Sequence, residues 1–369
     1  MLRILVMTKR QYTGRDILDD RFGRLRELPL QLALKGHTVR GLCLSYVNKK
    51  EGFFLDGPVC WYSINATPLK FPGLIRFLKV ARAHAAKSDI IWACSDSIYG
   101  IIGYGLSKIY KIPLVFDLYD NFESFLTARL PVVKQLYRYV VKKCNTVTCV
   151  SPPLAKLVTA YGRKKRTIIL ENAVRKDLFL PLNRDKCREN LNLPQNARII
   201  GTAGALQSNR GIKILFDAFN IIKNKYPDLH LAVAGPRDIR IPRNTRIHDL
   251  GVLPFERVPI LINAMDVSVV CNLENAFGYY CFPQKTREIM ACNIPIVAAN
   301  VGSMKELFKD RLEWLYEPSD VQSLIRVLEN RFHDRTTHYA PPPSWSDLAQ
   351  IFEKILVQIH DENEKNESS

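Results

Sequence analysis

The chain has 369 residues, of which 47% are apolar and 24% charged, a composition typical of a globular protein long enough for two domains. Its nine cysteines include no C-x-x-C pair, which argues against a disulfide framework or a zinc site and favours reduced thiols in a cytoplasmic protein. No apolar run approaches the roughly 18 residues that span a bilayer. The first residues, LRILVM, read as a strand rather than a signal peptide.

The net charge of +17 lies entirely in the first half of the chain. Residues 1–200 hold 34 Lys and Arg against 15 Asp and Glu, whereas residues 201–369 hold 19 against 21. This asymmetry suggests an anionic partner for the first half: a membrane surface, a lipid-phosphate acceptor or nucleic acid. A basic solvated surface without a partner is the alternative. Because the sequence has no aromatic-rich RNA motif and no zinc finger, we expect no nucleic acid partner.

The first predicted elements are a strand over residues 2–7, a loop containing Thr13 and Gly14, and a helix over 22–34. Two later stretches, 69–87 and 125–143, mix Lys and Arg with large apolar residues at helical spacing. Such basic amphipathic segments are typical of helices that lie on an anionic bilayer. Solvated helix faces are the commoner explanation for either stretch alone. Because both stretches lie in one basic half, peripheral membrane contact is an equal alternative.

A strand predicted over residues 112–116 leads into Asp117, Tyr119 and Asp120. The carboxyl end of a parallel strand is where ligands bind in open α/β sheets. Tyrosine is a poor base near neutral pH, because its unperturbed pKa is about 10. We therefore expect Asp117 and Asp120 to contact or deprotonate an acceptor hydroxyl, and Tyr119 to face the acceptor beside them. The alternative for Asp120 is a cap of its loop.

The second half begins with a predicted strand at residue 198 and a glycine-rich turn at Gly204, before a helix over residues 211–219. A turn of this kind lets a phosphate approach the backbone closely. Arg210 stands at the helix start and suits bidentate phosphate contact. The alternative is an ordinary loop cation, since the helix dipole disfavours positive charge there.

Residues 266–302 predict a strand, a loop, a helix from about Pro283 to Cys292 and a second strand. Ligands of such a unit lie at the loop and the helix start, where free N–H groups favour a phosphate. Lys285 and Glu288 are three residues apart and share one helix face. An ordinary ion pair is the alternative interpretation of these two residues.

The pattern FPxK, E and MACxxPIVA over 282–298 resembles the donor-nucleotide segment of family 4 glycosyltransferases. The resemblance implies a GT-B fold, with two doubly wound α/β Rossmann-like domains facing a central cleft. It also implies that Glu288 accepts hydrogen bonds from the donor ribose and that cations at Arg210 and Lys285 bind the diphosphate. Gly204 would approach the phosphates, and backbone groups near Leu253 would read the base. The Thr13–Gly14 loop would face the acceptor.

The chain departs from the family at several positions. The family motif E-x-F-G corresponds to Asn275 followed by Phe277 and Gly278, so we assign the donor-sugar contact to the nearest carboxylate, Glu274. The family histidine is Tyr119, and one of two basic residues after the glycine-rich turn is absent. A degenerate, non-catalytic binder of sugar nucleotides or membranes is therefore the alternative to an enzyme.

The resulting prediction is a metal-independent, retaining glycosyltransferase of the hexosyltransferase type that needs no cofactor. It would move a sugar from a nucleotide-sugar donor to a glycan or lipid-linked acceptor, in cell-surface polysaccharide or glycolipid synthesis. We expect it in the cytoplasm, peripheral at the inner face of the membrane. The predicted organisation is an acceptor domain (1–181), a linker (182–197), a donor domain (198–343), a helix crossing back to the first domain (344–360) and a disordered tail (361–369).

Overall fold

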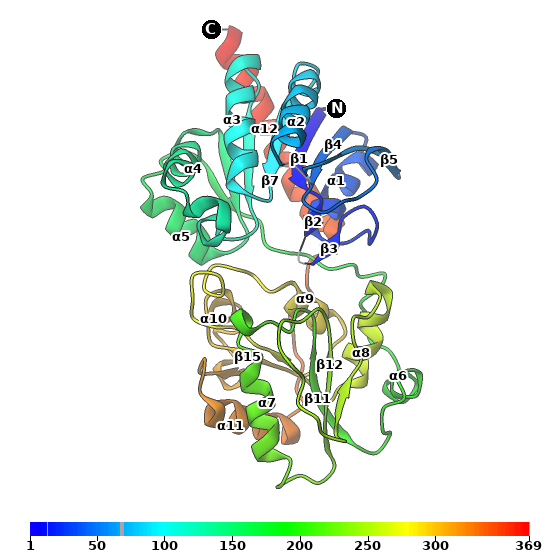
Figure 1. Cartoon of the computed structure of the whole chain (residues 1–369). Coiled ribbons are helices and arrows are strands. Elements are labelled where there is room, and N and C mark those ends of the chain that lie inside the picture. Colours follow the sequence, from blue (N-terminus) through cyan, green and yellow to red (C-terminus); the bar gives the residue numbers. More distant parts are fainter. Residues whose placement is uncertain (13, 67–69, 369) are drawn as a thin grey trace. The chain divides into compact units, whose positions relative to one another are not determined.

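The computed structural model describes residues 1–12, 14–66 and 70–368. It divides into two compact units (Figure 1), Met1–Glu171 with Trp345–Ser369, and Asn172–Ser344. Each unit is built on a parallel sheet, so the predicted α/β class is confirmed for both. The first unit also contains a short antiparallel pair, β2 (Gln11–Tyr12) with β3 (Arg15–Asp16).

The first unit holds an eight-stranded sheet in the order β10-β9-β8-β7-β1-β4-β6-β5. Only the β5–β6 pair is antiparallel. Strands β7, β8 and β9 are buried along their whole length, as expected for central strands covered on both faces. The strands are β1 (Arg3–Lys9), β4 (Thr38–Ser45), β5 (Gly52–Asp56), β6 (Val59–Asn65), β7 (Ile90–Cys94), β8 (Leu114–Leu118), β9 (Thr146–Cys149) and β10 (Thr167–Ile169).

Six α-helices and two 3₁₀ turns belong to the described part of this unit. Helices α2 and α3 lie side by side (Figure 1) and are joined by a hydrogen bond from Arg82 to the Tyr110 hydroxyl. The helices are α1 (Arg24–Leu34), α2 (Lys70–Ala85), α3 (Ser97–Tyr110), α4 (Pro131–Lys143), α5 (Pro152–Ala160) and α12 (Trp345–Ser368), with η1 (Phe122–Ser124) and η2 (Leu126–Arg129).

The second unit holds a six-stranded parallel sheet in the order β13-β12-β11-β14-β15-β16. Its strands are β11 (Arg198–Ala203), β12 (Leu229–Ala234), β13 (Ile247–Asp249), β14 (Val267–Val270), β15 (Ile296–Ala299) and β16 (Leu315–Tyr316). Its helices are α6 (Arg184–Asn190), α7 (Lys213–Ile222), α8 (Val258–Ala264), α9 (Gln284–Ala291), α10 (Ser303–Leu307) and α11 (Val321–His333), with η3 (Ser208–Arg210), η4 (Phe255–Arg257) and η5 (Leu312–Trp314).

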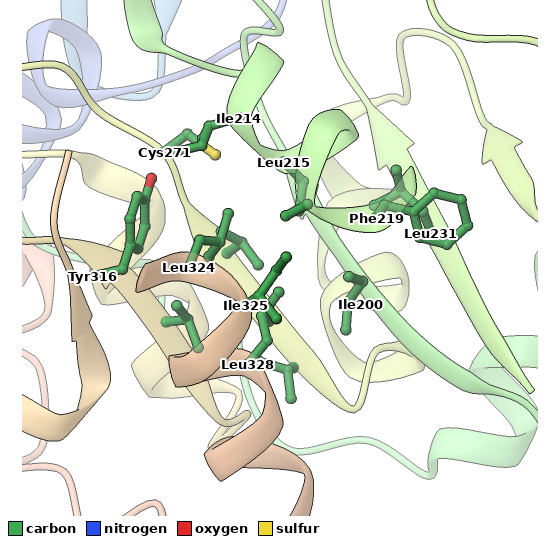
Figure 2. Close-up of a cluster of buried hydrophobic side chains, with 14 of the residues drawn as sticks. Ile200, Ile214, Leu215, Phe219, Leu231, Cys271, Tyr316, Leu324, Ile325 and Leu328 are labelled. Atoms are coloured by element: carbon green, nitrogen blue, oxygen red, sulfur yellow. The ribbon is translucent and has the colours of Figure 1, made fainter. Parts of the chain in front are cut away.

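The core of the second unit lies between this sheet and the helices α7 and α11. Figure 2 shows Leu215 and Phe219 of α7 with Leu324 and Leu328 of α11 over the strand residue Ile200. Helices α7 and α11 bury these side chains because their apolar residues recur at helical spacing. This core holds the strands of the second sheet in place. It therefore also fixes the positions at which the loops begin at the carboxyl ends of those strands.

Residues 182–197 were predicted to be a linker between domains. In the structure this stretch contains helix α6 and belongs to the second unit. The buried Arg188 of α6 donates to the Asp266 carboxylate at 2.8 Å and to the carbonyl oxygen of Ala264 at 2.9 Å. These charged hydrogen bonds between buried partners hold the segment against the second unit, although its polar composition alone predicts a flexible linker.

The predicted disordered tail, residues 361–369, is also corrected, since α12 continues to Ser368. Near its end, Glu362 pairs with Arg166 at 2.7 Å and the Asn363 amide donates to the carbonyl oxygen of Lys111 at 2.9 Å. Further back, the Phe352 ring meets the buried Trp92 ring with centroids 4.9 Å apart. Helix α12 is therefore a packed part of the first unit.

Candidate functional site

The candidate donor site is at the carboxyl edge of the second sheet. Strand β11 lies between β12 and β14, which the chain adds on opposite sides of it, so the winding changes direction at this strand. In open α/β sheets the ligand crevice forms at such a point. The loops that follow β11 and β14, together with the start of α9, carry most of the predicted donor residues.

Close backbone packing shapes this edge around Gly204. Gly204 (φ 127°) and Gly235 (φ 146°) both have positive φ, and a Cβ on Gly235 would lie 1.8 Å from the Gly204 carbonyl oxygen. A Cβ on Gly204 would lie 3.3 Å from Cε of Lys285. The structure thus brings the predicted glycine and lysine together, although they are 81 positions apart in the sequence.

Two cations converge beside this glycine. The Arg210 guanidinium stacks on the Phe277 ring, 4.7 Å from its centroid, and its buried Nε has no hydrogen-bond partner within the described residues. Lys285 Nζ lies 3.4 Å from the Thr202 hydroxyl. Burial, together with the positive charge of Arg210, lowers the pKa of Lys285 to about 8. Burial makes the charged form of Lys285 unfavourable, and a bound anion would stabilise that form.

Glu288 lies one turn further along α9 and is buried, with 6% of its surface exposed. Its negative charge acts on Lys285 in the direction that raises the lysine pKa, against the stronger effect of burial. The two side chains are therefore close, as their spacing predicts. The contact of Glu288 with a donor ribose stays a prediction.

The loop after β14 is organised by Asn275, the residue at the motif position where the family has glutamate. Its Oδ1 accepts hydrogen bonds from the backbone N–H of Phe277 at 3.0 Å and of Gly278 at 2.7 Å. Its Nδ2 donates to the carbonyl oxygen of Asn209 at 3.2 Å, which ties this loop to the one that carries Arg210. Gly278 is required here, because a Cβ would lie 2.0 Å from the Leu273 carbonyl oxygen. The asparagine is thus committed to the loop.

Two other predicted donor residues lie near this edge. Glu274 is exposed on the same loop, and its contact with the donor sugar stays a prediction. Leu253 is buried in the loop after β13. That loop is joined to the glycine turn by a hydrogen bond from the Gly235 N–H to the Gly251 carbonyl oxygen at 2.8 Å. A role of this loop in reading the base also stays a prediction.

In the first unit, Asp117 does not face solvent, and the prediction that it acts on an acceptor is wrong. It is fully buried in β8, and its two oxygens accept hydrogen bonds from Nε and Nη2 of Arg24, each at 2.8 Å. The Thr148 hydroxyl also donates to it, at 2.6 Å. Arg24 further donates to the carbonyl oxygen of Leu170 at 2.8 Å. The pair is a structural cross-link between α1 and the sheet.

Tyr119 is likewise turned inward. Its hydroxyl donates to the carbonyl oxygen of Ser95 at 3.1 Å, and burial raises its pKa well above the ordinary value. The predicted direct contact of Tyr119 with an acceptor is corrected, because the ring is buried against Tyr12 and Phe122. Asp120 accepts a hydrogen bond from the backbone N–H of Asn121 at 2.8 Å. This contact is the one expected if Asp120 caps its loop.

Two residues that the sequence did not single out accompany Asp120. Lys9, at the end of β1, lies over the Phe125 ring at 4.9 Å from its centroid. Burial lowers the pKa of Lys9, opposed by the negative charges of Asp96 and Asp120. Asp96 accepts a hydrogen bond from Thr127 at 2.6 Å. Lys9 ends strand β1, whereas Asp96 and Asp120 come two residues after β7 and β8. Their position at the carboxyl ends of strands was the signal that could have found them.

The predicted acceptor loop is described only in part. Thr13 lies outside the described residues, whereas Gly14 is exposed, with φ 81°, in the turn between β2 and β3. A positive φ of this size is the conformation that favours glycine in a tight turn. Its contact with an acceptor stays a prediction.

Within residues 1–12, 14–66 and 70–368, no three His, Cys, Asp or Glu side chains are grouped as a metal site requires. Over the same residues, no helix combines the length and apolar character of a membrane span.

Two family models match the chain. One described as Glycosyltransferase Family 4 matches residues 24–178, and one described as Glycosyl transferases group 1 matches residues 197–334. A curated relative, the D-inositol 3-phosphate glycosyltransferase of Streptosporangium roseum, is 26% identical over 276 residues. That match covers 67% of this chain and 60% of the relative, so the chain spans less than two thirds of the relative's length.

Two solved structures resemble the whole chain. Sucrose-phosphate synthase from Thermosynechococcus elongatus superposes with a TM-score of 0.75 at 18% sequence identity, covering 99% of both chains. The Anabaena protein HepE, solved in complex with UDP and glucose, superposes with a TM-score of 0.69 at 20% identity, covering 100% of both. At these identities the likeness establishes the fold. The likeness shows the GT-B fold, and the two family models, which match residues 24–178 and 197–334, show that the chain belongs to the family 4 glycosyltransferases.

Proposed function

We propose that the protein transfers a sugar from a nucleotide-sugar donor to a glycan or lipid-linked acceptor. The observation that carries this proposal is the pair of cations, Arg210 and Lys285, beside the backbone of Gly204. In the transfer, the bond between the sugar and the donor diphosphate breaks, and the leaving diphosphate gains negative charge. Two cations and the free N–H groups at the start of α9 would stabilise that charge as it develops.

The family supports the finer parts of the proposal: a hexosyltransferase that retains the anomeric configuration and needs neither a metal nor another cofactor. Positive side chains would take the part that a metal plays in other transferases. Asp120, with Lys9 nearby, would orient the acceptor hydroxyl from the first unit, and Glu274 would contact the donor sugar. We place the reaction in the cytoplasm, in the synthesis of cell-surface polysaccharide or glycolipid.

The direct test is donor turnover. The purified chain, stripped of metal with EDTA, should release nucleoside diphosphate from one member of a panel of nucleotide sugars. Release should accelerate when the right acceptor is added, and the product should keep the donor's anomeric configuration by NMR. Absence of turnover with every donor, or turnover that requires added metal, would contradict the proposal.

A second candidate is a non-catalytic binder of sugar nucleotides. The observations that favour it are that Asn275 is committed to its loop and that Asp117 and Tyr119 are buried by other interactions. Such a protein would bind a nucleotide sugar with the same cations and leave it intact. Binding of a donor by calorimetry, with neither hydrolysis nor transfer, would support the binder over the enzyme.

We also propose that the first unit contacts an anionic membrane surface. Helices α2, α3 and α4 contain no Asp or Glu, and α4 exposes Val132, Leu136 and Tyr139 at spacings of four and three residues. Lys142 and Lys143, also exposed, end the same helix. Apolar side chains flanked by basic ones on one helix support insertion at the level of anionic headgroups.

Vesicle co-sedimentation tests this contact. The protein should bind vesicles containing phosphatidylserine and not pure phosphatidylcholine, and Leu136→Gln with Tyr139→Ser should weaken binding by about tenfold or more. Ile221→Gln, which removes an exposed apolar side chain from α7 of the other unit, serves as the matched control. Equal binding by all three proteins would exclude this surface.

A further inference from the structure

A second cationic cluster lies at the amino edge of the second sheet, the edge opposite the candidate donor site. Arg198 is the first residue of β11, and Asp228 and Asp266 directly precede β12 and β14. These residues line a cavity of about 250 Å³ together with Arg184, Arg188 and Arg335. Four guanidinium groups and two carboxylates therefore surround one small polar space.

The charges around Asp266 are not balanced. Its carboxylate is buried and lies 2.8 Å from Arg188, 3.3 Å from Arg335 and 3.4 Å from Arg184. Arg184 also pairs with the exposed carboxylate of Asp185 at 3.1 Å, so two negative charges face three positive ones. Arg188 is fixed by further hydrogen bonds to carbonyl oxygens, whereas the side chains of Arg184 and Arg335 are 46% and 51% exposed and can turn toward a ligand.

Arg198 adds an N–H donor that has no acceptor among the described residues. Its guanidinium is held near the rings of Tyr226 and Phe332, with centroids 4.9 and 4.7 Å away. Its Nη1 is buried and has no hydrogen-bond partner in the described part of the chain. Its Nη2 is 3.9 Å from the Asp228 carboxylate. A buried N–H without an acceptor is costly, and Arg198 lines the cavity, so an anion there would bring an acceptor to this side chain.

An adjoining cavity of about 270 Å³ shares Arg184, Asp266 and Arg335 with the first. Its other walls are partly apolar and include Leu182, Met265 and Ile294. The arginines therefore stand between a polar space and a less polar one. A phosphoryl group in the first cavity would leave room for a small organic group in the second.

We propose that this edge is a binding site for a phosphoryl group, carried by a small phosphomonoester or present as inorganic phosphate. Guanidinium groups match phosphate geometry with paired N–H donors, and a doubly charged anion would offset the excess positive charge. The site is separate from the donor site, because the six residues of β11 put roughly 20 Å between the two edges. The proposal does not depend on sugar transfer.

Calorimetric titration of the full chain tests the site, with inorganic phosphate and glycerol 3-phosphate as probes in low-salt buffer. The wild type should bind either probe saturably, and Arg184→Gln with Arg335→Gln should weaken binding by about tenfold or more. Arg326→Gln removes an exposed arginine of α11 that lines neither cavity. This control should change the phosphate affinity by less than about twofold.

Unchanged affinity in the double variant, or no saturable binding by the wild type, would overturn the proposal. An equal loss in Arg326→Gln would also overturn it, since the effect would then be one of net charge alone. If the double variant does not fold, Arg335→Lys takes its place, because lysine keeps the charge and loses the paired donors, and unchanged affinity again overturns the site. Tighter binding of glycerol 3-phosphate identifies a phosphomonoester ligand, and equal binding identifies the free ion; both support the site.

Discussion

At the scale of single residues, Lys285 and Arg210 have the clearest expected effect on donor binding. Lys285→Met and Arg210→Gln should each raise the donor dissociation constant by about 10- to 100-fold, the usual loss for a charged hydrogen bond. Lys213→Met is the matched control, since Lys213 is an exposed lysine of α7 that pairs with Asp217 four residues on. A donor affinity that responds equally to all three substitutions would contradict the assignment.

The lowered pKa of Lys285 also predicts a dependence of donor binding on pH. The lysine of the free protein loses its proton near pH 8, and a bound diphosphate would favour the charged form. Donor affinity should therefore be constant below about pH 7 and fall above about pH 8, by at most about tenfold per pH unit. Binding measured by calorimetry from pH 6 to 10 checks this, and Lys285→Met should abolish the dependence.

The lowered pKa of Lys285 also affects stability, which should rise with pH where donor affinity falls. Between pH 8 and the ordinary value of 10.5, the unfolded chain holds the Lys285 proton and the folded protein does not. The contribution of this group to the free energy of unfolding should thus rise over that window.

The buried pair of Asp117 and Arg24 predicts a loss of stability. Asp117→Asn leaves the buried guanidinium of Arg24 without its charge partner, so unfolding in urea should show a loss of about 3–5 kcal/mol. Asp120→Asn, in the neighbouring loop, should lower turnover and leave stability within about 1 kcal/mol of the wild type. A stable Asp117→Asn variant without activity would restore the residue to the site.

At the scale of elements, the glycine turn at the end of β12 is the most constrained part of the site. Gly235→Ala would push a Cβ into the Gly204 carbonyl oxygen, whereas Gly251→Ala, also at positive φ, meets open space. The second substitution should cost about 1–2 kcal/mol from backbone strain alone. The first should cost more and weaken donor binding as well, as calorimetry would show. Equal effects of the two would mean that the close approach is not required.

The sequence predicts elements well where the signal is local. The β-branched runs of β14 and β15 identify buried strands, and the helix predicted to end at about Cys292 is followed by Asn293 in the left-handed conformation, with φ 56°. The predicted start of the helix at Pro283 is one residue too early, because Pro283 is the N-cap residue and α9 begins at Gln284. These patterns are set by residues that are close in the sequence, so the sequence alone is enough to predict them.

Partners far apart in the sequence could not be predicted in the same way. Asp117 ends a strand like a ligand-binding residue, and only its pairing with Arg24, 93 positions earlier, makes it structural. The cluster around Asp266 draws on residues 184 and 188 of α6 and on residue 335, all about 70 or more positions away in the sequence. The Arg210 and Lys285 pair was predicted because the family resemblance supplied a contact that spacing does not contain.

At the scale of the whole molecule, the end of the chain completes the first unit. Phe352 of α12 is fully buried against Trp92, whereas its neighbour Ile351 is about half exposed. Phe352→Ala should lower the free energy of unfolding by about 3–5 kcal/mol, and Ile351→Ala by less than about 1 kcal/mol. Hydrogen exchange should place the Phe352→Ala effect in the first unit. A change confined to α12 itself would show that the helix is only loosely attached.

The central claim is that the carboxyl edge of the second sheet binds the diphosphate of a nucleotide sugar through Arg210 and Lys285. Saturation-transfer NMR with a panel of nucleotide sugars tests it most directly. We predict transfer to one donor with the wild type and with Lys213→Met, and its loss with Lys285→Met and with Arg210→Gln. Undiminished transfer in the last two variants, or none to any nucleotide sugar with the wild type, would contradict the claim.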